Sequence, residues 1–319
     1  MTRTLLLAGG VGGARFLRGL AAEVPAGELD VVVNTADDET FHGLHISPDV
    51  DTLLYTLAGK VDPAQGWGLR GDRFDTMDAL DALGEDVWFR LGNKDLATHL
   101  FRTTALARGE SLTKVTRRQS KALGVEVRVR PMSDDRVRTV IHTPQGKLAF
   151  QEYLVRDRAR SEVRKITYAG IRKARPAPGI LQAISRANVI LIAPSNPFVS
   201  IGPILALPGV RNALRRSPAP VIGVSPLIGG RTVKGPADRM MRGLGFEATP
   251  QGLADIYGGL LDGLLLDQQD QQHQSTLTRS GISVECLPIL MNTAAKSRQV
   301  ARAALALGAN LRTTSRKAV

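Results

Sequence analysis

A glycine-rich segment near the start of the chain, GGVGG at Gly9–Gly13, constrains the fold more than any other feature. It follows a short apolar run at Thr4–Ala8 and precedes a helical pattern of apolar residues at Ala14–Ala22. A second apolar run, Asp30–Val33, comes next. A strand, a glycine turn, a helix and a second strand in this order predict a βαβ unit, in which the two strands are parallel.

The C-terminal half repeats the signal of buried strands. Asn188–Ala193 and Pro220–Val224 are nearly continuous apolar runs, each followed by proline and polar residues, as is typical of parallel strands buried on both faces. Together with the first unit they predict an α/β fold, a Rossmann-like doubly wound and mostly parallel sheet. Helices are expected at Pro203–Arg215 and Ala294–Leu307, and further strands or helices at Ile256–Leu266 and Ser283–Leu287.

The middle of the chain has a different pattern. Val125–Val129 and Arg138–His142 alternate apolar and polar residues, and a turn-forming segment separates them, so we expect an antiparallel pair of strands. This predicts a smaller inserted α+β subdomain at residues 111–175. Residues 1–110 and 176–319 then form the Rossmann-like catalytic core.

Composition is that of a globular protein, with 43% hydrophobic and 23% charged residues. No apolar run reaches the roughly 20 residues that a membrane helix requires, and the apolar stretch at the N-terminus is too short for a signal peptide. Cys286 is the only cysteine, so no intrachain disulfide can form. We therefore expect a cytoplasmic protein that does not contact a membrane.

The chain is basic, with 42 Lys and Arg against 30 Asp and Glu and a net charge of +12. The positive charge is densest between Arg156 and Arg175, where Tyr168 is the only aromatic residue. Binding of single-stranded nucleic acid relies on several aromatic platforms, so this composition argues against a nucleic-acid partner. A solvated face or a rim that attracts phosphate groups is the interpretation we favour.

The glycine turn is a candidate phosphate site. Glycines let the backbone approach an anion, and a helix N-terminus offers free N–H groups, so Gly10, Gly12 and Gly13 are candidate nucleotide contacts. The segment is not a dinucleotide-binding fingerprint, because Arg15 stands where the third glycine belongs, and it lacks a Walker lysine. A purely structural tight turn is the alternative.

An acidic segment follows the second strand. Asp37 and Asp38 come directly after that strand, with Asp49 and Asp51 further on. Ligands of parallel sheets bind outside the carboxyl ends of the strands, so these acids and the glycine turn should share one crevice. Carboxylates beside a phosphate site indicate Mg²⁺, for which Asp37, Asp38 and Asp49 are the candidate ligands. Alternatively, these acids only cap or begin helices.

Other polar segments stand where ligands are commonly bound. Asn93 and Lys94 lie in a turn before a helical stretch that contains Thr98, His99 and Arg102. Loops after two predicted strands carry Ser195, Asn196 and Ser225, which are candidate nucleotide contacts. His42 and His45 lack a metal-binding context and are structural or surface residues in our interpretation.

Taken together, these segments resemble the 2-phospho-L-lactate transferase family of coenzyme F-420 biosynthesis. The combination is specific, covers most of the chain and occurs in the family's order. It comprises Leu5–Leu20, Val31–Tyr55, Leu91–Arg102, Arg130–Asp135, Ala193–Gly209 and Val224–Ala237.

The resemblance implies a Rossmann-like homodimer and a Mg²⁺-dependent transfer between small molecules. The family's donor is a three-carbon phospho-acid linked to GDP. Its acceptor is the deazaflavin Fo, whose terminal ribityl hydroxyl attacks the phosphorus that carries the acid, and GMP leaves. Whether the acid is 2-phospholactate, phosphoenolpyruvate or 3-phosphoglycerate stays open, because a pocket separates such groups by only a few kcal/mol.

The resemblance also assigns residues. It implies that Asp51 contacts Fo and orients or deprotonates its hydroxyl, with Asp49 as a second catalytic acid. It places Asn93 and Lys94 at Fo, although Lys94 stands where relatives have Arg and lacks the planar guanidinium fork. The glycine turn with Ser195, Asn196 and Ser225 would hold the nucleotide, and Asp37, Asp38 and Asp49 would hold Mg²⁺.

Two other classes of protein share parts of this pattern. A related family of non-enzymatic, nucleotide-sugar-binding regulators has the same glycine opening, but the segments Glu39–Leu44 and Ile46–Asp51 favour the transferase. A nicotinamide-dependent oxidoreductase is disfavoured by Arg15.

Overall fold

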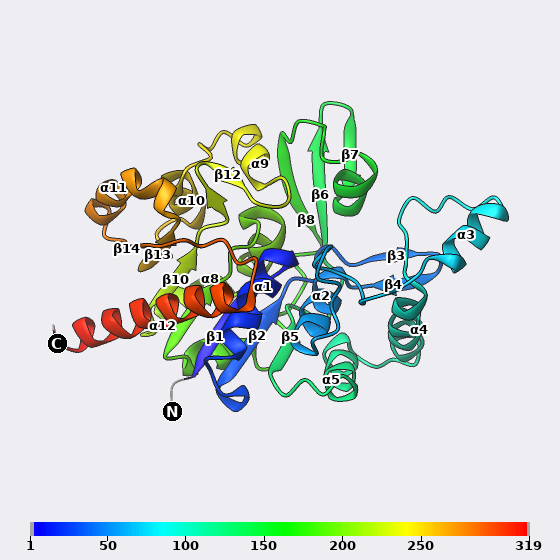
Figure 1. The fold of residues 1–319 in the computed structure, drawn as a ribbon, viewed down its shortest axis with the longest axis horizontal. Helices are drawn as coiled ribbons and strands as arrows, with labels where there is room; N and C mark the ends of the chain where they lie inside the picture. Colours follow the sequence, from blue (N-terminus) through cyan, green and yellow to red (C-terminus); the bar gives the residue numbers. More distant parts are fainter. Residues whose placement is uncertain (1–2, 318–319) are drawn as a thin grey trace.

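The computed structural model describes residues 3–317. Within them, seven parallel strands form the central sheet in the order β14-β13-β10-β9-β1-β2-β5 (Figure 1). The chain winds outward from β1 in one direction, returns to β9, and then winds outward in the other, which confirms the predicted Rossmann-like α/β fold. The strands are β1 (Thr4–Ala8), β2 (Leu29–Val33), β5 (Arg128–Pro131), β9 (Val189–Ile192), β10 (Val221–Val224), β13 (Gly263–Leu266) and β14 (Ser283–Cys286).

Helices cover both faces of the sheet, because the strands are apolar on both sides. In β1, Leu6 and Ala8 face one core cluster, whereas Leu5 and Leu7 face the other. The first cluster is closed by α1 (Gly10–Ala21), α2 (Pro48–Leu57) and α12 (Ala294–Lys317). The second is closed by α6 (Ile180–Arg186), α7 (Gly202–Ala206), α8 (Val210–Arg216), α10 (Pro250–Tyr257) and α11 (Gln274–Arg279). Each fully buried leucine contributes about 1.5–3 kcal/mol to stability.

The C-terminal part of the first helix, α1, packs against the first turns of the last helix, α12. A Cβ atom on Gly19 of α1 would lie 2.1 Å from the Ser297 carbonyl oxygen, so only glycine permits this approach. Arg18 donates a hydrogen bond to Ser297 at 3.1 Å, and Glu23 pairs with Arg298 and with Arg302. The first and last helices therefore form one packed unit on the same face of the sheet.

A lobe built mainly of helices extends beyond the β2–β5 side of the sheet, and its colours run from blue through cyan to blue-green in Figure 1. It contains the hairpin of β3 (Glu39–Phe41) and β4 (Leu44–Ile46) together with α3 (Asp75–Ala82), α4 (Asn93–Ala107) and α5 (Leu112–Ala122). Phe41 stacks on Phe89 with ring centroids 4.0 Å apart, and Trp88 meets the Phe41 ring edge-on. These aromatic contacts join the hairpin to the segment between α3 and α4.

The expected antiparallel pairing of Val125–Val129 with Arg138–His142 is wrong. β5 instead extends the central sheet by pairing in parallel with β2, whereas β6 (Arg138–Thr143) forms a separate antiparallel sheet with β7 (Gly146–Ala149) and β8 (Lys165–Ala169). β5 is an edge strand in which only alternate residues are buried, so its sequence has the alternation of an antiparallel strand. The division into a core and an insertion at 111–175 stays a prediction.

The expected helix at Pro203–Arg215 is divided in two. Gly209 has a left-handed backbone, with φ of +85°, and separates α7 from α8.

Among the described residues, no helix is long and apolar enough to cross a membrane. The remaining elements are η1 (Ala26–Glu28), η2 (Glu152–Arg156), η3 (Pro197–Ile201), β11 (Leu227–Ile228), β12 (Arg231–Thr232), α9 (Ala237–Gly243) and η4 (Gln268–His273).

Candidate active site at the carboxyl ends of the strands

The direction of winding reverses between β1 and β9, and the glycine turn and Ser195 lie at this switch point. Ser195, just after β9, donates a hydrogen bond from Oγ to the Gly9 carbonyl at 2.7 Å and accepts one from the Gly9 N–H at 3.3 Å. Two segments 186 residues apart are thus joined at the crevice where doubly wound folds bind ligands.

The glycines at the start of α1 are required by close packing. A Cβ atom on Gly12 would lie 2.4 Å from the Pro194 carbonyl oxygen, and one on Gly13 would lie 2.8 Å from Ser195 Oγ. Gly10 has a φ of +64°, in the left-handed region. The glycine turn therefore brings α1 directly onto the loop after β9, in agreement with a structural role for these positions.

The carboxylate of Asp49 lies at the N-terminus of α1. A Cβ atom on Gly9 would meet Asp49 Oδ2 at 2.4 Å, and the Gly10 N–H donates a hydrogen bond to the same carboxylate. A helix N-terminus stabilises negative charge, so α1 holds an anion supplied by the chain itself. Burial raises the pKa of Asp49 to about 6, against the opposing effect of hydrogen bonds from Asn34 and Gly10.

Asn34, the first residue after β2, links two of the predicted metal ligands. Its Nδ2 donates hydrogen bonds to Asp37 Oδ2 and to Asp49 Oδ2, both at 2.9 Å. Burial, together with the negative charge of Asp49, raises the pKa of Asp37 well above its usual range. Asp37 and Asp49 thus destabilise each other as anions, and a cation between them would relieve this repulsion.

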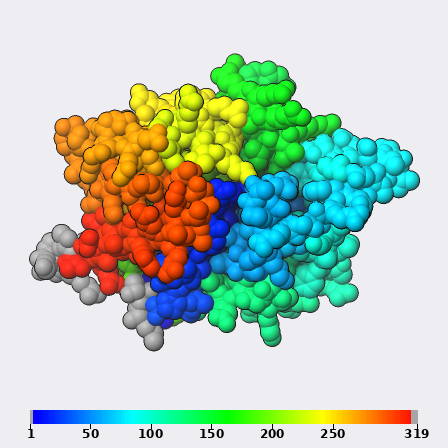
Figure 2. Space-filling view, viewed as in Figure 1, coloured from blue at the N-terminus to red at the C-terminus, as the bar shows by residue number. Residues whose placement is uncertain are grey.

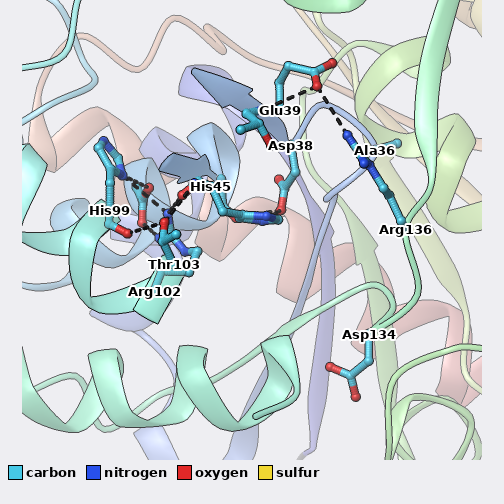
Figure 3. Close-up of polar contacts among 12 residues, drawn as sticks. Ala36, Asp38, Glu39, His45, His99, Arg102, Thr103, Asp134 and Arg136 are labelled. Atoms are coloured by element: carbon cyan, nitrogen blue, oxygen red, sulfur yellow. Dashed lines mark hydrogen bonds and ion pairs between the residues drawn. The ribbon is translucent and has the colours of Figure 1, made fainter. Parts of the chain in front are cut away.

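Asp38 is held from the hairpin side (Figure 3). Ser47 donates a hydrogen bond from Oγ to Asp38 Oδ2 at 2.5 Å, and His45 Nε2 lies 3.1 Å from the same oxygen. His45 is therefore a structural residue, one of the two roles expected for it from the sequence. His42 is exposed at the tip of the hairpin with a φ of +50°, and it is a surface residue.

The three predicted Mg²⁺ ligands fit a hard cation in their chemistry. Asp37, Asp38 and Asp49 are all buried, and Asp37 Oδ1 and Asp38 Oδ1 have no hydrogen-bond partner. Buried carboxylate oxygens without partners are costly unless a cation binds them. Their oxygens do not converge within 4.8 Å, but Mg²⁺ takes only one or two protein carboxylates when it also binds phosphate.

Among the described residues, the one group of acids and histidines that does converge within 4.8 Å is Asp51, Asp95 and His99. Arg102, which is fully buried, forms an ion pair with Asp51 at this point. A divalent cation would face the buried guanidinium there, so this group is a network of ion pairs in our interpretation.

The network extends from Asp51 along α4. His99 lies between the two acids, with Nδ1 3.7 Å from Asp51 Oδ2 and Nε2 3.4 Å from Asp95 Oδ2. Tyr55 of α2 donates a hydrogen bond to Asp95 Oδ1 at 2.5 Å. Figure 3 shows His99 and Arg102 projecting from the same helix toward the hairpin segment that carries His45.

No role for His99 or Arg102 was predicted from the sequence. The only indication in the sequence was a helical spacing of polar residues, which places four of them on one face of α4: Asp95, Thr98, His99 and Arg102. A polar helical face ordinarily indicates solvent, and the sequence contains nothing that marks this face as buried.

The other predicted Fo residues, Asn93 and Lys94, fasten the loops that lead into α4. Asn93 donates to Asp75 Oδ2 at 2.7 Å and accepts from the Thr76 N–H at 3.1 Å. Lys94 is exposed, and its Nζ donates to the Gly71 carbonyl at 2.9 Å. Both residues lie next to Asp95, so the start of α4 connects them to the Asp51 network.

Asn196 and Ser225 shape the loops after β9 and β10. Asn196 Oδ1 accepts hydrogen bonds from the Phe198 and Val199 N–H groups at 2.9 and 3.3 Å, which caps η3. Ser225 Oγ accepts a hydrogen bond from the Leu227 N–H at 3.1 Å. Both stand at the carboxyl edge of the sheet, on the β9–β10 side of the glycine turn.

A family model described as 2-phospho-L-lactate transferase CofD matches residues 5–300, which carry the glycine turn, the buried acids and the Asp51 network. The chain belongs to the CofD family. It is 45% identical over 317 residues to a phosphoenolpyruvate transferase of Kitasatospora aureofaciens, with 97% of this chain and 99% of the relative covered. It is 38% identical over 307 residues to a 2-phospho-L-lactate transferase of Methanococcoides burtonii, with 96% of this chain and 100% of the relative covered.

The fold of this CofD family member is also found in a solved structure. A member of the UPF0052 family from Bacillus halodurans matches it with a TM-score of 0.63 at 18% identity, covering 96% of this chain and 99% of that one. At this level of identity the similarity supports the fold and carries no statement on activity.

Proposed function

We propose that the protein transfers a three-carbon phospho-acid from its GDP-linked form to the ribityl hydroxyl of Fo and releases GMP, in coenzyme F-420 biosynthesis. The similarity to transferases along almost the whole chain carries this proposal. Several relatives at 40–45% identity are named phosphoenolpyruvate transferase, so phosphoenolpyruvate is the acid that we propose.

We further propose that Mg²⁺ binds at Asp37, Asp38 and Asp49. The support is the set of buried carboxylate oxygens without partners and the mutual repulsion of Asp37 and Asp49. When bound, the ion would neutralise negative charge on the phosphate groups of the donor.

Asp51 is the residue that we propose for the acceptor hydroxyl. Arg102 binds Asp51 Oδ1 and fixes the carboxylate, whereas Asp51 Oδ2 has no hydrogen-bond partner among the described residues. That oxygen can orient the hydroxyl or accept its proton. Transfer of a phosphate-linked group depends more on positioning and charge neutralisation than on a strong nucleophile. Asp51 would supply the positioning, and the proposed Mg²⁺ would supply the neutralisation.

The homodimer, the cytoplasmic location and the roles of Asn93 and Lys94 at Fo stay predictions. The second candidate function, a nucleotide-sugar-binding regulator, is retained because the family of such regulators shares the glycine opening of this chain. Such a regulator would bind a nucleotide without forming a product.

One experiment separates these functions. The protein is incubated with Fo, Mg²⁺ and each of the three guanylated acids, and the products are identified by mass spectrometry. We expect an Fo phosphodiester and GMP, formed fastest with the phosphoenolpyruvate donor. Absence of an Fo phosphodiester with every donor would overturn the proposal.

The role of Asp51 is tested in the same assay. Asp51→Asn should lose turnover while retaining the far-ultraviolet circular dichroism of the wild type. Asp81→Asn removes an exposed acid on α3 and should not change the rate. Near-normal turnover by Asp51→Asn would remove this residue from the mechanism.

A further inference from the structure

A cavity of about 200 Å³ lies at the amino-terminal edge of the central sheet, between α6 and the strands β1, β2 and β5. This is the edge at which the described chain begins in Figure 1, and the glycine turn lies at the opposite edge. The residues with charged or amide side chains that line the cavity are Arg3, Asp30, Arg128, Arg130, Gln182 and Arg186.

The cavity is on the face of the sheet that α6 covers. Asp30 alternates along β2 with Leu29 and Val31, which belong to the core cluster on the other face, so the Asp30 side chain points toward α6. Figure 2 shows that other face, with α12 in red and α2 in light blue. Along β1, which has five residues, the cavity is roughly 15 Å from the glycine turn.

Asp30 is the one acid that lines the cavity, and two arginines of β5 neutralise it. Arg128 donates from Nε to Asp30 Oδ1 and from Nη2 to Asp30 Oδ2, both at 3.1 Å, and Arg130 donates from Nη1 to Oδ1. The pairing follows from the parallel register, which places Asp30 opposite Arg128. The carboxylate is therefore already occupied by the chain itself.

Arg130 keeps one edge of its guanidinium free. Within residues 3–317, its Nε and Nη2 donate no hydrogen bond, because only Nη1 binds Asp30. These two atoms lie 3.3 and 3.6 Å from the position of a Cβ atom on Gly179, just before α6, so a side chain there would crowd them. The glycine leaves open the edge of the guanidinium that can bind two oxygens of one anion.

Two further arginines at the cavity have no acidic partner in the described chain, namely Arg186 in the last turn of α6 and Arg3 before β1. The Arg3 backbone exchanges two hydrogen bonds of 2.8 Å with Asn188, which holds this residue beside the end of α6. Four guanidinium groups against one carboxylate leave three excess positive charges around the cavity. A bound anion would relieve the repulsion among these positive charges.

We propose that this cavity is a binding site for a phosphate group, either inorganic phosphate or a small phosphate monoester. Sites for drug-sized ligands occupy roughly 300–1,000 Å³, so the ligand here is smaller than a nucleotide. A phosphate dianion matches the excess of positive charge better than a single carboxylate does, and the planar guanidinium binds two of its oxygens at once. The site is independent of the proposed function, because it lies at the edge of the sheet opposite the candidate active site.

The test is isothermal titration calorimetry without Mg²⁺, at physiological ionic strength, with inorganic phosphate and phosphoenolpyruvate as the probes. Arg130→Gln and Arg186→Gln should each weaken binding by roughly tenfold or more, the usual effect of losing a hydrogen bond to a charged group. Arg216→Gln is the matched control and should bind as the wild type does. Like α6, α8 follows a left-handed glycine and ends in an exposed arginine, but Arg216 does not line the cavity.

Two outcomes would overturn the site: no binding of either probe by the wild type at millimolar concentration, or unchanged affinity in the Arg130→Gln, Arg186→Gln double variant. Thermal unfolding verifies the fold of each variant, and Arg186→Gln breaks no ion pair of the described chain.

A third probe, the dicarboxylate malonate, tests the chemistry of the ligand. It should bind more weakly than phosphate, and tighter binding of malonate would overturn the assignment to phosphate. Equal affinity for the two phosphate probes would identify free phosphate as the ligand, whereas tighter binding of phosphoenolpyruvate would identify a monoester, and either result supports the site. Absence of an Fo product in the transfer assay would end the proposed function and leave this assignment standing.

Discussion

Arg102 donates a hydrogen bond from Nη2 to Asp51 Oδ1, and the arginine side chain is completely buried. The same guanidinium donates from Nη1 to the His45 carbonyl at 3.2 Å. One cation of α4 therefore fixes both the proposed acceptor-binding acid on α2 and the backbone of the β3–β4 hairpin. Loss of this cation would leave Asp51 as an unpaired buried charge.

We predict that Arg102→Leu lowers the free energy of unfolding by about 3–5 kcal/mol, the usual cost of removing one partner of a buried ion pair. Urea denaturation measures this change. Arg73→Gln breaks the exposed Arg73–Asp75 pair and should leave the unfolding midpoint unchanged. Equal, small effects of both substitutions would contradict the buried position of Arg102.

The raised pKa of Asp49 predicts a pH-dependent stability. Its value of about 6 in the folded protein exceeds the ordinary 3.8, so the native state binds the proton more tightly than the unfolded chain does. This contribution to stability is present in full below pH 4 and is lost as the pH rises through 6, to a total of roughly 3 kcal/mol. Asp49→Asn removes it.

The measurement is the difference in unfolding free energy between Asp49→Asn and the wild type, without Mg²⁺, at several pH values. We expect the variant to gain stability relative to the wild type between pH 4 and pH 7. A difference that does not change with pH would show that Asp49 titrates normally.

The contact between α1 and the loop after β9 predicts a steric effect at Gly12. Gly12→Ala should lower the free energy of unfolding by about 1–3 kcal/mol, because the new methyl group overpacks against the Pro194 carbonyl. Gly27→Ala is the control, since nothing lies within 4 Å of a Cβ atom there. If both variants unfold at the same denaturant concentration, the packing described for α1 is incorrect.

The two hydrogen bonds between Ser195 and Gly9 predict a combined effect on stability and nucleotide binding. Ser195→Ala should cost roughly 1–2 kcal/mol of unfolding free energy, since each hydrogen bond contributes about 1 kcal/mol. It should also raise KM for the donor more than it lowers kcat, because the residue positions the turn. Ser185→Ala removes an exposed hydroxyl on α6 and should change neither quantity.

The sequence predicts the centre of the sheet well and its edge poorly. β1, β2, β9 and β10 are buried on both faces, so their apolar runs are continuous and their positions agree with the structure to within a few residues. β5 pairs on one side only, and Arg128 and Arg130 both bind Asp30 of β2. These polar contacts gave β5 an alternating pattern that indicated the wrong pairing.

The candidate site was predictable where it follows strand ends. Ser195, Asp37 and Asp49 were placed at one edge by the rule for parallel sheets, and the structure brings them together around Gly9 and Asn34. The buried pairing of Arg102 with Asp51 depends on how α4 packs, which local sequence does not encode.

The packing of α12 on α1 has a consequence for synthesis. α1 is among the first helices to leave the ribosome, yet the surface around Gly19 is covered only when Ser297 has been made. The glycine turn is the N-terminal end of that same helix, so its final position depends on residues translated almost 280 positions later. Folding of the nascent chain can form the strands early, but the region around the glycine turn should be completed last.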